Sequence, residues 1–292
     1  MTSTPGDLPD VLARLGTDDP GPQREDSPVA VDAADRLLLD EAAELLATAT
    51  PGEVAVVDDR YGALTLGAAA LADGAAPDGA GSVVRVHQDA CTAEAALDAN
   101  AVALGLTGAY ARRPLGPELL TGARVVLLRL PRGLAALRDV AEHVARAAHP
   151  DVVLLAGGRV KHMTPAMNDV LGESFADVRA SRGRGKSRVL VARSPRAPEG
   201  PPTYPVTAAL PDVGLTVVAH GAAFAGPSLD LGTRFLLEQL DHAPTAPGAS
   251  EGVPAPRDVV DLGCGTGLLA AWAARRWPET HVVAADRSDA AV

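Results

Sequence analysis

The stretch VVDLGCGTGLLAAW, residues 259–272, decides how this chain folds because it joins an apolar run, three alternating glycines and the start of a helix. The three glycines are Gly263, Gly265 and Gly267. Glycine lets the backbone turn sharply and approach a ligand closely, and the helix predicted over 268–276 would point its N-terminal amides at the same place. The stretch therefore predicts a buried strand, a tight turn and a helix that together form a ligand site.

The spacing of these glycines indicates the ligand. A dinucleotide site uses the spacing G-x-G-x-x-G, whereas this chain has G-x-G-x-G led by an acid at the strand end, which favours S-adenosylmethionine over NAD. A further strand is predicted over 281–285, and Asp286 after it would accept hydrogen bonds from both ribose hydroxyls. The candidate cofactor-binding residues of this region are Asp261, Gly263, Cys264, Gly265, Thr266, Gly267 and Asp286. A tight turn without a ligand is the alternative.

Strand and helix patterns alternate along the rest of the chain. Helices are predicted over 32–48, 64–72, 93–104, 134–148, 163–171 and 231–240, and strands over 54–57, 83–86, 125–130, 152–156, 189–192 and 215–219. This alternation predicts an α/β fold in which helices flank a parallel sheet. Five prolines between Ser194 and Pro205 mark a domain boundary.

A weak echo of the glycine turn occurs in the first half of the chain. If Asp58 is laid over Asp261, Gly62 matches one of the three later glycines, and His87 falls about where the later unit has its ribose acid. The other two glycine positions are taken by Arg60 and Leu64. Side chains at the turn would block close approach, and loss of the acid would remove the ribose acceptor. The echo predicts a first unit of the same fold without a cofactor site; chance similarity is the alternative.

Composition excludes several classes of protein. The 292 residues carry a formal net charge of -11, which argues against broad nucleic-acid coating but leaves room for a local basic patch. Cys91 and Cys264 stand far apart and the histidines lack ligand spacing, so neither a disulfide scaffold nor a metal site is expected. Residues 1–28 predict a flexible tail without signal-peptide order, and no apolar run is long enough for a membrane helix. We therefore expect a cytoplasmic location.

A basic segment interrupts this acidic chain. Residues 179–196 contain seven basic side chains and no acidic one. Residues 180–187 satisfy a relaxed P-loop pattern, but the strand predicted over 189–192 replaces the helix that a P-loop requires, so a nucleotide site is not expected. A hairpin of this charge could neutralise RNA phosphates. A solvated loop is the alternative.

Taken together, these segments resemble the bacterial ribosomal RNA guanine-N2 methyltransferases, from about Val31 onward. The resemblance is carried by residues 57–64 (VDDRYGAL), 129–132 (RLPR), 158–163 (GRVKHM), Phe224, 229–233 (LDLGT) and 261–267 (DLGCGTG). It implies two Rossmann-like class I methyltransferase-type units, the first degenerate and without cofactor, the second catalytic. It also implies that Asp230, a plausible helix N-cap, lies with Gly232 and Thr233 over the bound S-adenosylmethionine. The RNA-binding residues it suggests are Lys161, His162, Arg182, Arg184, Lys186 and Arg188.

One departure from the family is large. The family's catalytic motif, Asn-Pro-Pro followed by an aromatic residue, occurs nowhere in the sequence, so no catalytic residue is assigned. Without that motif the target amine is not oriented toward the methyl group. We therefore expect that the second unit is incomplete, truncated within its catalytic part, and that these 292 residues alone are inactive.

The predicted organisation is thus a tail over 1–28, a degenerate methyltransferase-like domain over 29–196, a linker over 197–205 and the start of an S-adenosylmethionine-binding domain over 206–292. The second unit is expected to be poorly ordered after about Thr203, because its sheet edges would be uncovered. The predicted function is methylation of guanine N2 in ribosomal RNA, on a flipped-out base, with ribosomal RNA or a ribosomal subunit as partner. The alternatives are a non-catalytic RNA-binding or ribosome-assembly protein and, third, an NAD-dependent oxidoreductase.

Overall fold

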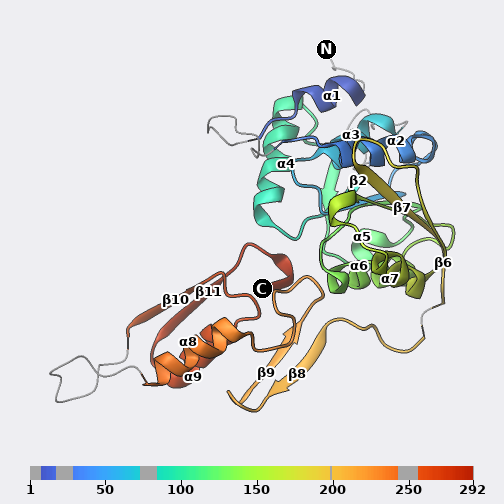
Figure 1. Cartoon of the computed structure of the whole chain (residues 1–292). Helices are drawn as coiled ribbons and strands as arrows, with labels where there is room; N and C mark the ends of the chain where they lie inside the picture. Colours follow the sequence, from blue (N-terminus) through green and yellow to red (C-terminus); the bar gives the residue numbers. More distant parts are fainter. Residues whose placement is uncertain (1–7, 18–28, 73–83, 198, 243–255, 292) are drawn as a thin grey trace. The chain divides into compact units, whose positions relative to one another are not determined.

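The chain divides into two units, Met1–Pro201 and Pro202–Val292, which are described separately. The computed structural model describes residues 8–17, 29–72, 84–197, 199–242 and 256–291 (Figure 1). The division between the units falls inside the Pro-rich segment 197–205, where the sequence predicts a linker.

A seven-stranded mixed sheet forms the centre of the first unit, in the order β3-β2-β1-β4-β5-β7-β6. Its strands are β1 (Val54–Val57), β2 (Val84–His87), β3 (Tyr110–Arg112), β4 (Val125–Arg129), β5 (Val153–Arg159), β6 (Phe175–Ala180) and β7 (Ser187–Pro195). The first five strands pair in parallel, but β7 runs antiparallel to both β5 and β6. The predicted parallel sheet is confirmed for β1, β2, β4 and β5, whereas at this edge β6 and β7 form an antiparallel hairpin joined by a short turn.

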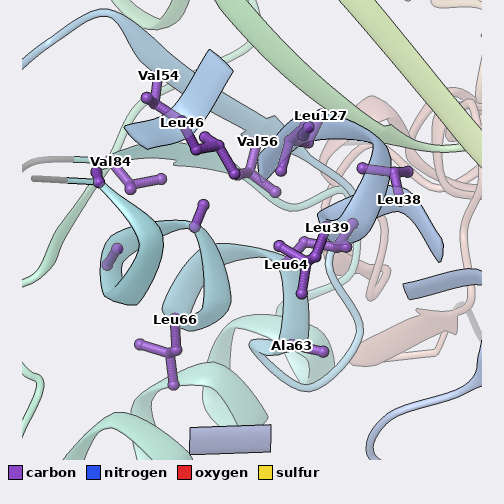
Figure 2. Packing of buried hydrophobic residues seen from close by; sticks show 14 of the residues in the cluster. Leu38, Leu39, Leu46, Val54, Val56, Ala63, Leu64, Leu66, Val84 and Leu127 are labelled. Atoms are coloured by element: carbon purple, nitrogen blue, oxygen red, sulfur yellow. The ribbon is translucent and has the colours of Figure 1, made fainter. Parts of the chain in front are cut away.

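Helices cover both faces of this sheet. They are α1 (Leu8–Arg14), α2 (Ala33–Ala47), α3 (Ala63–Leu71), α4 (Cys91–Leu104), α5 (Pro117–Leu120), α6 (Leu134–Ala147) and α7 (Ala166–Ser174), with a 3-10 turn at Val160–His162. Successive strand residues face opposite sides. Accordingly, Val54 and Val56 pack against α2 and α3, where Leu39 and Leu46 are fully buried (Figure 2). Ala55 and the other strand residues that point to the opposite face of the sheet pack against α5, α6 and α7.

Helix α2 begins where its sequence supplies a capping box. The Asp32 carboxylate accepts hydrogen bonds from the amides of Ala34 at 2.7 Å and Asp35 at 3.1 Å. The Asp35 carboxylate accepts in return from the Asp32 amide at 2.9 Å. These bonds satisfy amides that have no partner inside the helix, and they fix the two acids beside the sheet.

The N-terminal segment is more ordered than the sequence predicts. Residues 8–14 form α1, and its Val11 and Leu12 are buried in the core of the first unit. The amide of Gly16 also donates to the Asn100 side chain at 2.9 Å. The prediction of a flexible tail is wrong for this part, because two apolar residues suffice to anchor one helical turn; residues 1–7 and 18–28 lie outside the described residues.

Within its described residues, 202–242 and 256–291, the second unit contains two small sheets and two helices. Its elements are β8 (Val206–Leu210), β9 (Leu215–Ala219), α8 (Leu231–His242), β10 (Asp258–Leu262), α9 (Leu268–Arg276), β11 (His281–Ala285) and a 3-10 turn at Asp289–Ala291. Strands β8 and β9 form an antiparallel hairpin, whereas β10 and β11 pair in parallel. One face of the second sheet exposes Val260, Leu262 and Val283. Poor order of this unit stays a prediction.

Candidate functional site

The glycine turn of the second unit connects β10 to α9. Gly263, Gly265 and Gly267 have φ angles of 78°, 54° and 74°, in the left-handed region that L side chains rarely adopt. A Cβ atom built on any of the three would meet no heavy atom within 4 Å. The glycines are therefore required by the backbone conformation, and the space around them is open.

A cavity of about 290 Å³ lies over this turn. It is lined by Phe224, Ala225, Ser228, Asp230, Gly232, Thr233, Leu236, Gly263, Cys264, Gly265, Thr266, Leu268 and Leu269. The structure thus brings the Asp230–Thr233 segment and the glycine turn together around one space. Sequence reasoning did not assign Leu236, Leu268 or Leu269 to the site, because apolar helix residues carry no signal that separates a cavity wall from a core.

The two acids that flank the turn do not line this cavity directly. The Asp261 carboxylate accepts a hydrogen bond from the Ala270 amide at 3.1 Å and so fixes α9 against β10. The Asp286 carboxylate accepts from the amides of Gly265 and Ser288, each at 2.9 Å. These backbone hydrogen bonds, first from Ser288 and then from Gly265, lower the pKa of Asp286, so the group is ionised at neutral pH. A carboxylate has about four acceptor positions, which leaves capacity for two hydroxyls.

Asp230 forms the N-cap at the start of α8. Its carboxylate accepts hydrogen bonds from the amides of Gly232 at 2.9 Å and Thr233 at 3.2 Å. Hydrogen bonds from the Thr233 side chain and backbone lower the pKa of Asp230. The cap therefore holds the small residues of this segment in the conformation that forms the cavity wall.

The cysteines and the metal-ligand types form no reactive centre in the described part of the chain. Cys91 and Cys264 are both free. Partial burial, followed by the charges of Asp261 and Asp286, raises the pKa of the Cys264 thiol, so it is a neutral packing group at physiological pH. Among the described residues no cluster of three His, Cys, Asp or Glu side chains could hold a metal, and no helix could cross a membrane.

The first unit contains a turn of closely related backbone geometry between β1 and α3. The Asp58 amide donates to the His87 carbonyl at 3.0 Å, as the Gly263 amide donates to that of Ala285 at 2.8 Å. Asp58 also has a positive φ of 61°. This correspondence aligns Gly62, the left-handed N-cap of α3, with Gly267, the left-handed N-cap of α9. It also aligns Gln88 with Asp286, the acid expected to bind the ribose. The alignment that lays Asp58 over Asp261 is therefore wrong by two residues at the turn, where Asp58 matches Gly263, and by one residue at His87.

Side chains fill the space in this first turn. The buried Gln88 accepts a hydrogen bond from the Asp59 amide at 2.7 Å and donates to the Asp59 carbonyl. The fully buried Asp59 carboxylate accepts from the Thr65 amide at 2.7 Å, which is the role of Asp261 in the second turn. A Cβ atom on Gly62 would stand 2.8 Å from a methyl group of Leu97. The first turn thus keeps the backbone geometry, but it has Gln88 at the position of Asp286 and buried side chains around its glycine.

The predicted RNA-binding residues lie along one edge of the first unit. Lys161 and His162 follow β5, and Arg182, Arg184 and Lys186 lie in the turn between β6 and β7, while Arg188 is in β7. All six are exposed. The Val160 amide donates to the Lys186 carbonyl at 2.9 Å, so the two segments adjoin. Arg184 pairs with Asp40 at 3.1 Å.

The fold and the open glycine turn define a class I S-adenosylmethionine-dependent methyltransferase. Residues 19–196 match the family model of the RLMG N-terminal domain, and residues 214–292 match that of the methyltransferase small domain. The chain belongs to the ribosomal RNA large subunit methyltransferase G family.

Two relatives and one solved structure illustrate this membership. The Pseudomonas syringae pv. syringae enzyme of that name is 31% identical over 93% of this chain and 67% of its own length. The Streptomyces griseus enzyme is 34% identical over 82% of this chain and 59% of its own length. A T. thermophilus 16S rRNA N2 methyltransferase (RsmC), in complex with AdoMet and guanosine, shares the fold with a TM-score of 0.59 and 21% identity over 89% of this chain and 64% of that one. The chain spans about two thirds of the length of these relatives.

Proposed function

We propose that this chain supplies the donor-binding turn and the RNA-recognition unit of a methyltransferase that modifies guanine N2 in ribosomal RNA. The observation that carries the proposal is the open glycine turn beneath the Asp230–Thr233 segment, next to an ionised acid at the end of β11. The names of the relatives support ribosomal RNA of the large subunit as the substrate.

The residues around the cavity suit S-adenosylmethionine. The glycines allow the backbone to approach the donor, and the N-terminus of α9 supplies amides that lack intrahelical partners. Asp286 would accept hydrogen bonds from the ribose hydroxyls, while Asp230, Gly232 and Thr233 would cover the donor. When bound, S-adenosylmethionine supplies an electrophilic methyl group on its sulfonium. The chain's own residues hold and orient it, and the apolar wall of Leu236 and Leu269 excludes water.

No residue of this chain is assigned to the acceptor step. The sequence has no Asn-Pro-Pro-aromatic motif that would orient the amine of the base. We therefore propose that these residues bind the donor without transferring its methyl group by themselves. Methylation of ribosomal RNA by the isolated chain in a turnover assay would contradict this.

The basic edge of the first unit is proposed to contact the RNA. Lys161 and His162 adjoin the turn that carries Arg182, Arg184 and Lys186, with Arg188 beside it, and together they form a positive track on an acidic protein. Such a track favours a polyanion over a single small ligand. A cytoplasmic location follows from this proposal, because the substrate is ribosomal RNA.

The second candidate function is that of a non-catalytic RNA-binding protein. It is favoured by the same basic edge, which lies on a unit whose own turn has Gln88 in place of the acid expected to bind the ribose. The two functions differ in one requirement, since only the methyltransferase needs the second unit to bind S-adenosylmethionine. An oxidoreductase would instead bind NADH.

Isothermal titration of the chain with S-adenosylmethionine tests the proposal. Asp286→Asn removes a charged acceptor, so we expect the affinity to fall about 10- to 100-fold, the effect of one to two hydrogen bonds to a charged group. Asp289→Asn is the matched control, since Asp289 is exposed three residues further on; its affinity should stay within about twofold of the wild type. Equal affinity of the Asp286→Asn variant and the wild type, or preferential binding of NADH, would contradict the proposal.

A further inference from the structure

Two hollows adjoin at the carboxyl ends of β1, β4 and β5 in the first unit. Their volumes are about 230 Å³ and about 270 Å³. Both are lined by Arg60, Arg129, Leu130 and Arg132. The first is also lined by Arg159, Lys161 and His162, the second by Asp58 and Asp89. In an open α/β sheet this edge is where ligands bind, and it is the edge that carries the donor turn in the second unit.

The first hollow concentrates positive charge that the surrounding residues do not neutralise. Arg129 is neutralised, because it pairs with Asp32 at 2.7 Å and also with Asp35. The remaining cations of this hollow form no ion pair with an acidic side chain in the described part of the chain. They are Arg60, Arg132, Arg159 and Lys161.

Two further observations support an anion at this place. The buried Nε atom of Arg159 has no hydrogen-bond partner among the described residues. Desolvation, followed by the positive charges of Arg132, Lys161, Arg159 and Arg60, lowers the pKa of His162. The fields of these four cations therefore overlap at the His162 ring. The second hollow is less suited to an anion because its carboxyl groups oppose the charge.

We propose that the first hollow binds one backbone phosphate of the RNA substrate, at the edge where the second unit binds its donor. The inference rests on the proposed function and makes it more specific. Guanidinium groups match phosphate oxygens in geometry as well as charge. Lys161, which lines the hollow, follows Val160, whose amide donates to the Lys186 carbonyl, so the basic turn adjoins the hollow. This arrangement suits a chain of phosphates better than a single carboxylate. A donor is not expected at this place, since the neighbouring turn has Gln88 at the position of Asp286.

The test measures RNA binding by the whole chain. A fluorescein-labelled single-stranded RNA of about twenty nucleotides is titrated by anisotropy at several salt concentrations, with wild type and the Arg60→Gln, Arg132→Gln double variant. Loss of one phosphate contact should reduce the slope of log K against log salt by about 0.7 and weaken binding about tenfold at low salt. The affinity for S-adenosylmethionine should not change, because both arginines lie in the first unit.

The matched control removes two arginines from the opposite edge of the same sheet, outside the basic segment 179–196. Arg124 directly precedes β4, and Arg146 lies in the last turn of α6, the helix that leads into β5. The Arg124→Gln, Arg146→Gln variant loses the same charge and should keep the wild-type salt slope. Lys161→Gln should weaken RNA binding on its own. Because Arg60 and Arg132 are exposed, thermal unfolding of their double variant should match the wild type.

Several outcomes would overturn the inference. An unchanged slope and affinity in the Arg60, Arg132 variant would overturn the phosphate site and leave the proposed function standing. An equal loss of RNA affinity and salt slope in the control variant would show that the effect depends only on the net charge of the protein, which would overturn the phosphate site. If inorganic phosphate alone bound the wild type and not the variant, while RNA bound both equally, the ligand would be free phosphate. Absence of RNA binding by the wild type would overturn the RNA part of the proposed function as well, while donor binding is decided separately by calorimetry.

Discussion

The β1–α3 turn and the β10–α9 turn share one backbone design and differ in what occupies the space above it. Both turns have a left-handed residue directly after the strand and a left-handed glycine at the helix N-cap. In the second turn an ideal Cβ on any glycine meets nothing, whereas in the first the space holds Leu97, Gln88 and Asp59. Loss of a cofactor site therefore does not require loss of the fold, because buried side chains replace the contacts that a ligand would make.

The two turns also differ in the direction in which the pKa values of their carboxyl groups are shifted. Burial raises the pKa of Asp58 and of Asp59 in the first turn. Hydrogen bonds to backbone amides lower the pKa of Asp286 beside the second. In the first turn, burial thus opposes ionisation of these two carboxyl groups. The second keeps an ionised acid available to a ligand.

The largest expected effect concerns the pH dependence of the first unit. Burial raises the pKa of Asp35 from 3.8 to about 7, although Arg129 opposes this. The folded state then holds a proton that the unfolded state has released. Stability of the first unit should therefore fall as pH rises from about 4 to about 7 and level off above, by on the order of a few kcal/mol.

Urea unfolding of the first unit between pH 4 and pH 8, followed by hydrogen exchange and mass spectrometry, checks this. Asp35→Asn stays neutral at every pH and should flatten the profile. The second unit should show no such fall in this range, since the pKa values of Asp230 and Asp286 are lowered from 3.8 and their contribution is lost only as pH falls below that value. If the stability of the first unit rose from pH 4 to pH 7, the predicted difference between the two units would be contradicted.

A second prediction uses the N-cap glycine of each turn. Gly62→Ala adds a Cβ that would stand 2.8 Å from Leu97 and 3.2 Å from Leu66, at a φ of 90°. Left-handed strain and overpacking together should destabilise the first unit by about 3 kcal/mol. Gly267→Ala places its Cβ in open space at a φ of 74°, so only strain of roughly 1–2 kcal/mol is expected in the second unit.

Denaturant unfolding of both variants separates these costs. Both tryptophans, Trp272 and Trp277, lie in the second unit and contact each other edge to face, so their fluorescence reports that unit. Equal destabilisation by the two substitutions would show that the first turn is not filled more tightly than the second.

The smallest effect is expected at the helix cap beside the donor cavity. Asp230→Ala removes the acceptor of the Gly232 and Thr233 amides and should destabilise the second unit by about 1 kcal/mol, measured by tryptophan fluorescence. Asp230→Asn can still cap the helix and should restore most of this stability. If neither variant differed from the wild type, the cap would not hold the cavity wall.

Much of the fold and of the donor site could be predicted from sequence. Apolar runs marked β1 and β4 because these parallel strands are buried on both faces, and glycine spacing marked the turn after β10 because few other residues adopt its φ angles. Strands β3, β6 and β8 were missed. Each is short or alternates polar with apolar residues at a sheet edge, where the burial signal is weak.

Other features depend on contacts that no local pattern encodes. The replacement of the ribose acid by Gln88 follows from strand register, and sequence alignment of the turns missed it by one residue. Arg60, Arg132 and Lys161 follow three strands that are distant in sequence, and they come together only in the folded sheet. Isolated arginines give no such signal, because exposed arginines are common on protein surfaces.

The chain is expected to have one donor site, in the second turn, and a degenerate counterpart in the first. Calorimetric titration with S-adenosylmethionine of the wild type and of the Gly265→Val and Arg60→Gln variants tests it most directly. The account predicts one molecule bound per wild-type chain, no binding by Gly265→Val, and wild-type affinity for Arg60→Gln. Retained binding by Gly265→Val, or its loss in Arg60→Gln, would contradict the account.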